Sequence, residues 1–155
     1  MKFLYLLFLF FCLSVLTSCH SYVYDQKIEL EGNEWSYAKS IDFSFEIQDT
    51  TNMYHLYLEV EHLSDYAYQN VYAELEVIFP DKKTRKELLS MELSDGSGKW
   101  IGDCNKTICK RKMIFMPRAR FLLQGRYKLH FKQSSRISAL KGIKSIRLFI
   151  EKEKK

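Results

Sequence analysis

The chain has 155 residues, of which 46% are hydrophobic and 28% charged, with few Gly or Pro. This composition is typical of a globular protein and excludes collagen-like, low-complexity and disordered chains. The formal net charge of +5 is unevenly distributed: residues 20–103 carry 7 Lys/Arg and 17 Asp/Glu, whereas residues 104–150 carry 13 Lys/Arg and no acid. No nucleic-acid-binding motif accompanies the basic segment, so we do not expect a nucleic-acid partner.

The basic segment allows two interpretations. A long basic stretch can bind phosphates, anionic headgroups or an acidic partner. The alternative is that its strands pair with the acidic ones, so that the folded surface carries both signs. We favour the second interpretation, because the basic residues alternate with apolar ones along the segment instead of clustering in a tail.

The first eighteen residues have the pattern of a secretory signal. Lys2 is followed by a nearly continuous apolar run from Phe3 to Leu16, and the run ends in Leu16-Thr17-Ser18-Cys19. A short positive start, a short apolar run and small residues before a cut define a cleavable signal peptide. The order Leu, two small residues, Cys is the bacterial lipobox. We therefore expect residues 1–18 to be removed and Cys19 to be lipidated; the alternative is an uncleaved N-terminal anchor.

The expected lipid anchor also suggests a location in the cell. One acyl chain holds a protein only marginally on a membrane, whereas the two or three chains of a lipoprotein cysteine attach it stably. His20 replaces the Asp of the enteric inner-membrane retention rule, and no acidic run follows Cys19. We expect an outer-membrane lipoprotein that faces the periplasm. Residues 19–33 are predicted to form the lipidated N-terminus and a tether, and residues 34–155 a single domain.

Period-two alternation of apolar and polar residues dominates the rest of the chain. Each such run places one face in a core and one face in water, which is typical of antiparallel β-strands. Turn sequences such as Pro80-Asp81 and Asp95-Gly96-Ser97-Gly98 separate the runs. About eight short strands predict an all-β, antiparallel β-sandwich, with a jelly roll as one form of it. Strong strands are expected near 41–47, 54–60, 71–79, 127–132 and 146–150, weaker ones near 23–30, 84–93 and 107–115, and one short helical turn at 134–140.

Two cysteines remain once Cys12 has left with the signal and Cys19 is lipidated. Cys104 and Cys109 form an even pair in an exported, oxidising setting, which favours a disulfide. A zinc site would need a second pair of ligands, and a thioredoxin-like centre would need two intervening residues instead of four. We predict a disulfide, with two free thiols as the alternative, and no metal site.

No catalytic constellation is recognisable, and no cofactor is expected. His55 and His130 fall on expected exposed strand faces, His62 ends a strand, and Ser97 has no paired base nearby. The chain also lacks a nucleophile elbow, a phosphate-binding glycine loop and a zinc-protease motif. Asp49-Thr50-Thr51 is similar to a triplet that some Bacteroidetes use for O-glycosylation. Thr50 is therefore a candidate for modification, with a simple turn as the alternative.

Several stretches of the chain, taken in order, form a pattern that extends beyond the signal. They are Leu16–Cys19, Val23-Tyr24-Asp25, Trp35, Phe43–Thr51, Tyr54-His55-Leu56-Tyr57, Asp65–Asn70, Phe79-Pro80, Gly98-Lys99-Trp100-Ile101-Gly102 and Leu140-Lys141-Gly142-Ile143. In this order they resemble the gliding-motility lipoprotein family GldH of Bacteroidetes, over essentially the whole chain beyond the signal, although no single motif is decisive. The resemblance implies an envelope lipoprotein needed for gliding over surfaces, with no catalytic residue or cofactor to carry over. The Cys104–Cys109 segment and Lys110-Arg111-Lys112 depart from the family pattern.

Two functions follow from these observations. The first is a non-enzymatic, membrane-anchored component of the gliding machinery that binds another envelope protein. Its contact candidates are Trp100 in the glycine-flanked loop and Tyr66 and Tyr68 in the 64–70 turn, although Trp100 could equally plug the end of the sandwich. The second is a carbohydrate-binding or carbohydrate-processing module. A concave sheet lined with aromatic residues would favour the second, and a charged exterior with buried aromatics the first.

Overall fold

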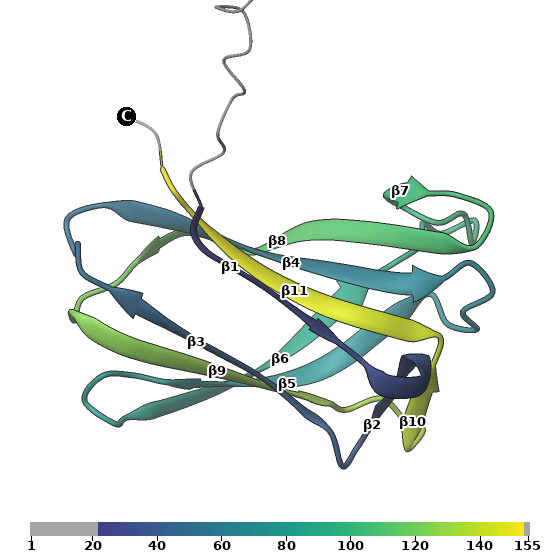
Figure 1. Cartoon of the computed structure of the whole chain (residues 1–155), viewed down its shortest axis with the longest axis horizontal. Helices are drawn as coiled ribbons and strands as arrows, with labels where there is room; N and C mark the ends of the chain where they lie inside the picture. The colour runs from purple at the N-terminus through teal and green to yellow at the C-terminus, as the bar shows by residue number, and fades with distance from the viewer. Residues whose placement is uncertain (1–21, 154–155) are drawn as a thin grey trace, which may run out of the picture.

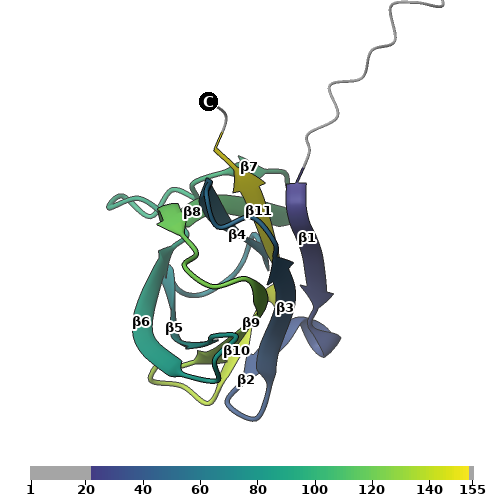
Figure 2. The same cartoon turned by 90° about the vertical axis from the view of Figure 1, so that its left-hand side faces the viewer.

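The computed structural model describes residues 22–153, which form an antiparallel β-sandwich without an α-helix in that range. The prediction of an all-β sandwich is thus confirmed. Figure 1 shows the strands running lengthwise, and Figure 2 shows β4, β8 and β11 on one side of the interior and β5, β6 and β9 on the other. One sheet contains, in spatial order, β1 (Tyr22–Glu29), β11 (Ile143–Lys152), β4 (Met53–Leu63), β8 (Ile108–Arg120) and β7 (Asp103–Cys104). The other contains β3 (Ser40–Ile47), β9 (Gly125–Gln133), β5 (Asn70–Ile78) and β6 (Thr84–Glu92).

The strand pairing is that of a jelly roll. The pairs β5–β6, β4–β8, β3–β9 and β1–β11 are nested around the β5–β6 hairpin, as in a long hairpin rolled over itself. Rolling interleaves the pairs, so β11 lies between β1 and β4 in one sheet and β9 lies between β3 and β5 in the other. The jelly-roll form of the predicted sandwich is therefore the one observed.

Alternation in the sequence becomes the core between the sheets. On β3, Ile41, Phe43, Phe45 and Ile47 are buried, while the residues between them are exposed. The inner face of β4 packs against this layer with Tyr54, Leu56, Leu58 and Val60. Burying both apolar faces is what stabilises two sheets in contact. Phe131 lies edge-on to Phe43, and Tyr127 stacks on Phe45, so aromatic rings fill much of the interior.

Three elements differ from the prediction. The two-residue strand β7 and the three-residue strands β2 (Glu34–Ser36) and β10 (Ala139–Lys141) were not expected. The short helical turn predicted for 134–140 is wrong, because β10 pairs with β2 there and Tyr37 N donates to Ser138 O. Residues 22–33, expected in the tether, contain β1, which pairs along its length with β11, so the folded domain includes them.

The loops lie at the two ends of the sandwich. The N-terminal end, where β1 begins, carries the loops 48–52, 79–83 and 121–124, on the left in Figure 1. The distal end, on the right, carries the loops 64–69, 93–102, 105–107 and 134–138. In the described residues, no helix is long and apolar enough to cross a membrane.

Candidate functional site

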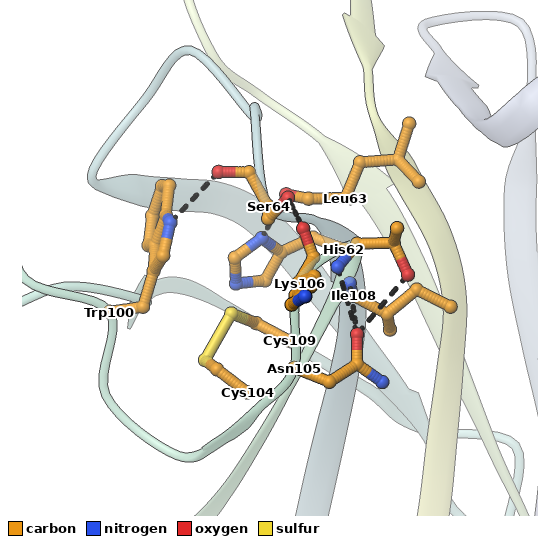
Figure 3. The surroundings of a disulfide bond; sticks show 10 residues. His62, Leu63, Ser64, Trp100, Cys104, Asn105, Lys106, Ile108 and Cys109 are labelled. Atoms are coloured by element: carbon orange, nitrogen blue, oxygen red, sulfur yellow. Dashed lines mark hydrogen bonds between the residues drawn. A yellow bond between two sulfur atoms is a disulfide. The ribbon is translucent and has the colours of Figure 1, made fainter.

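The distal end brings together the three aromatic residues that the sequence singled out. Trp100 is partly buried, and its ring packs edge-on against His62 at 4.6 Å between centroids. Its Nε1 donates to the backbone carbonyl of Ser64 at 3.0 Å, as Figure 3 shows. Trp100 therefore covers the end of the core. Tyr66 is only 4% exposed, so its interpretation as an exposed contact residue is wrong. Tyr68, at 42%, is exposed as expected.

His62 lies beneath Trp100 and is fully buried on β4. Burial lowers the pKa of His62, although the hydrogen bond of Nδ1 with Leu63 O opposes the shift. Its Nε2 has no hydrogen-bond partner among residues 22–153. A buried imidazole with a lowered pKa is neutral at physiological pH. His62 is thus part of the packing. Its burial was not predictable from the sequence, in which His62 is only the end of an expected strand.

Cys104 and Cys109 form the predicted disulfide. It closes the turn between β7 and β8, where Asn105 Oδ1 accepts hydrogen bonds from the backbone N–H groups of Thr107 and Ile108, both at 2.9 Å. Ser64 attaches this turn to the neighbouring loop: its N donates to Thr107 O and its Oγ to Lys106 O, both at 2.9 Å. Figure 3 shows the disulfide beside His62 and Trp100, so the turn and the aromatic cluster form one unit.

A shallow pocket of about 340 Å³ opens at the same end. Tyr68 and Tyr72 line it with their half-exposed rings, 42% and 39% accessible. Asn70 Nδ2 donates to the Tyr72 hydroxyl at 2.8 Å, which holds that ring in place. Across the pocket lie Arg136, Ile137 and Leu140 from the segment after β9. Aromatic rings, a guanidinium and aliphatic groups in a shallow hollow are the side chains that protein interfaces favour. We call Tyr68, Tyr72, Arg136 and Ile137 the distal pocket.

Part of the basic segment is matched by acids: five of its thirteen basic residues form ion pairs with acids among residues 22–153, namely Lys110, Lys112, Arg118, Lys144 and Arg147. Glu61 on β4 is nearly buried and lies 3.0 Å from Lys27 and 3.1 Å from Lys144. Arg147 on β11 makes a bidentate pair with Asp25 of β1, at 2.7 and 2.6 Å. The prediction that the folded surface carries both signs is confirmed for these strands.

The residues considered for catalysis do not converge. Ser97 donates to Asp95 within its own turn, His130 pairs with Asp42 on a sheet face, and His55 lies at the other end of the molecule beside Glu153. Among residues 22–153, no three His, Cys, Asp or Glu residues are grouped so as to hold a metal ion. Thr50 is partly exposed in a turn that Asp49 organises by accepting from Thr51 N at 2.9 Å. Cys19 lies outside the described residues.

Comparison with known proteins gives consistent matches along the chain. A gliding motility lipoprotein GldH homologue of Christiangramia forsetii is 26% identical over 150 residues, 92% of this chain and 91% of the relative. The gliding motility lipoprotein GldH of Flavobacterium johnsoniae is 23% identical over 129 residues, 79% of this chain and 80% of the relative.

Solved structures are more distant. The mosquito-larvicidal Cry4Aa toxin of Bacillus thuringiensis aligns over 83% of this chain with a TM-score of 0.38 and 9% identity, and this chain spans about a fifth of the toxin's length, 21%. That likeness is too weak to carry an argument. The family profile is decisive, because GldH lipoproteins match residues 22–150, nearly the whole domain. The chain therefore belongs to the GldH lipoprotein family.

Proposed function

We propose that this lipoprotein serves the gliding-motility machinery of the cell envelope by binding another envelope protein through its distal end. The observation that carries the proposal is the distal pocket: exposed aromatic and basic side chains gather at the end of the sandwich opposite the start of β1. A lipid on Cys19 would hold the other end at the membrane. The pocket would then face away from the bilayer, toward a partner.

Binding accounts for the distal end better than catalysis does. Two polar groups that could act as a base are engaged in structure: His62 is buried under Trp100, and Asp95 organises its own turn by accepting from Ser97 N and Lys99 N. General acid–base catalysis needs such a group within hydrogen-bond reach of a substrate. The disulfide, the Asn105 turn and the Trp100 contact all stiffen the loops. Stiff loops suit recognition, because less conformational freedom is lost on binding.

The proposed location is the outer membrane, with the domain in the periplasm. The lipobox at Leu16–Cys19 supports the lipid attachment, and His20 together with the lack of an acidic run after Cys19 supports the face. Protease added to intact cells should leave the domain uncut and should cut it only after the outer membrane is opened. Digestion on intact cells would contradict the periplasmic face.

A deletion strain of a gliding host tests the function. Wild-type protein should restore spreading, whereas Tyr68→Ser combined with Arg136→Ser should fail to restore it at equal protein level, because both remove exposed pocket groups. Leu88→Ser is the matched control, since Leu88 is 68% exposed on β6 and does not line the distal pocket. A photocrosslinker placed at exposed position 138, beside the pocket, should link to an envelope protein in the otherwise wild-type chain and should no longer do so in the pocket variant. Full gliding by the pocket variant, or normal gliding by the deletion strain, would refute the proposal.

The second candidate function is glycan binding. The two exposed tyrosines of the distal pocket favour it, since sugar rings stack on such faces. Against it, most aromatic side chains among residues 22–153 lie in the core or pack against it, and the sheet surfaces are charged. Titration of the purified lipoprotein with envelope polysaccharide distinguishes the two: saturable binding that Tyr68→Ser abolishes, with no protein crosslink, would favour the glycan.

A further inference from the structure

Two leucines stand out at the N-terminal end. Leu122 and Leu123, in the loop between β8 and β9, are 77% and 39% exposed, whereas the preceding Phe121 is buried. They rim a pocket of about 460 Å³ whose walls are mainly apolar and include Phe79, Phe121 and Tyr127. Adjacent exposed apolar side chains around an apolar hollow mark an interaction site.

The loop holds these leucines outward by several contacts. Phe121 is buried against Tyr127, with ring centroids 4.8 Å apart, and the Tyr127 hydroxyl donates to Leu123 O at 2.9 Å. Gln124 Nε2 donates to Gln48 O at 2.7 Å, which ties the loop to the 48–52 loop. The 79–83 loop also lies against the end of this loop, because a Cβ added at Gly125 would lie 3.2 Å from Pro80 Cβ. The exposure of Leu122 and Leu123 is therefore set by the contacts of a well-packed loop and does not come from a frayed one.

Positive charge surrounds the leucines. Lys83, Lys152 and Arg118 are each paired with an acid of the same end. Arg120 and Lys82 are exposed and make no ion pair with any of residues 22–153. An apolar tip with surplus cations matches the interface of a bilayer that contains anionic lipids, where hydrocarbon and headgroup lie side by side.

The tether is short enough to bring this end to the bilayer. Two residues, His20 and Ser21, separate Cys19 from Tyr22, and these three residue steps can reach at most about 11 Å. Tyr22 lies opposite Glu151 of β11 in the strand register, and Glu151 lies opposite His55 of β4. His55 Nδ1 in turn accepts from Arg118 N of β8 at 3.3 Å. The start of β1 and the end of β8 thus lie on one level, about 14 Å apart at three strand spacings.

We propose that the 121–124 loop docks onto the lipid bilayer itself. Leu122 and Leu123 enter the interface between headgroups and acyl chains, and Arg120 and Lys82 contact anionic headgroups. This second contact fixes the orientation of the domain and points the distal pocket away from the membrane. The inference rests on the lipid anchor of the proposed function, but not on the identity of the partner.

Fluorescence quenching on vesicles tests the docking. The full lipidated protein with Leu122→Trp is reconstituted into vesicles of phosphatidylethanolamine and phosphatidylglycerol, with or without bromine on the acyl chains. The added tryptophan should lose at least half of its emission to the bromines. Leu88→Trp is the matched control and should lose none, because Leu88 is 68% exposed on the middle of β6. Leu123→Trp serves as a second probe. Arg120→Glu combined with Lys82→Glu should lower the equilibrium constant for docking about fivefold for each unit of charge changed on these vesicles.

Flotation of the same vesicles separates the possible failures. Protein that floats while position 122 is quenched no more than position 88 overturns the docking and leaves the anchor and the proposed function intact. Protein that does not float overturns the anchor and the docking together. Floating protein with selective quenching at positions 122 and 123 supports the proposal, and equal quenching in the charge-reversed variant would refute the role of Arg120 and Lys82.

Discussion

Trp100 Nε1 donates a 3.0 Å hydrogen bond to the carbonyl of Ser64, and this bond joins two loops that lie 36 residues apart in the chain. The same Ser64 binds the disulfide turn through Thr107 O and Lys106 O. Ser64 is therefore the point at which three segments of the distal end meet. The bond also explains why a tryptophan flanked by glycines packs as part of the fold.

Trp100→Ala should lower the free energy of unfolding by about 3 kcal/mol, because it empties the space over His62. Trp100→Phe keeps a ring there and loses the bond to Ser64, so it should cost about 1 kcal/mol. Urea unfolding of the purified lipoprotein gives both values. Leu88→Ala, at an exposed position, should change stability by less than about 0.5 kcal/mol. A Trp100→Ala protein as stable as that control would contradict the packing role.

Removal of the disulfide should act locally. The loop between Cys104 and Cys109 is short, so the chain-entropy model assigns it about 2 kcal/mol. Cys104→Ala with Cys109→Ala should fold, with that loss of stability, and its amides at 105–108 should exchange hydrogen faster than in the wild type. Amides in the middle of β3 serve as the internal reference and should be unchanged. Intact mass after alkylation without reductant checks the bond: two alkylated thiols at positions 104 and 109 would refute it.

Glu61 should make the fold sensitive to acid. Burial alone would raise its pKa, but hydrogen bonds from Lys27 and Lys144 outweigh it and hold the pKa below the ordinary 4.5. A lowered folded-state pKa contributes stability above the unfolded value, and that contribution is lost as pH falls through the folded pKa. The wild-type protein should therefore lose stability below about pH 4.5, whereas Glu61→Gln should be less stable at pH 7 and lose less on acidification.

Thermal unfolding at pH 7, 5 and 3.5 measures this difference. Glu59→Gln is the control, because among residues 22–153 the only ion pair of Glu59 is with Arg147, at 3.7 Å. Parallel pH curves for wild type and Glu61→Gln would show that Glu61 does not contribute to the acid sensitivity.

The strands were predictable where burial alternates strictly. On β3 and β5 every second residue is buried, so the period of two in the sequence directly predicts these strands and their buried faces. The strands β2 and β10 are too short to show a period. Ile137 and Leu140 have helical spacing, yet Tyr37 and the β2 pairing hold their segment extended. Local spacing cannot register such a tertiary pairing.

The candidate site was only partly predictable for the same reason. Tyr66 sits in a polar turn, and nothing near it in the sequence indicates that it is buried. Its cover comes from Gly142, 76 positions later, where a Cβ would lie 3.2 Å from Tyr66 Cδ2. The distal pocket likewise joins Tyr68 to Arg136, and only the rolled strand order brings these segments together. The lone glycine before β11 was a signal that could have been used.

The last prediction concerns Cys19, on which the membrane attachment depends. Cys19→Ala should accumulate as unprocessed precursor and incorporate no labelled fatty acid, because the thiol is the site of lipid transfer and the lipobox is cut only next to it. Cys12→Ala is the matched control, since Cys12 lies inside the apolar run, and it should mature and label normally. Metabolic labelling with an alkyne fatty acid, followed by gel separation of precursor and mature forms, measures both changes. A Cys19→Ala protein that still matures and takes up label would refute the prediction of a lipid anchor at Cys19. An unprocessed Cys12→Ala protein would instead indicate damage to the apolar run.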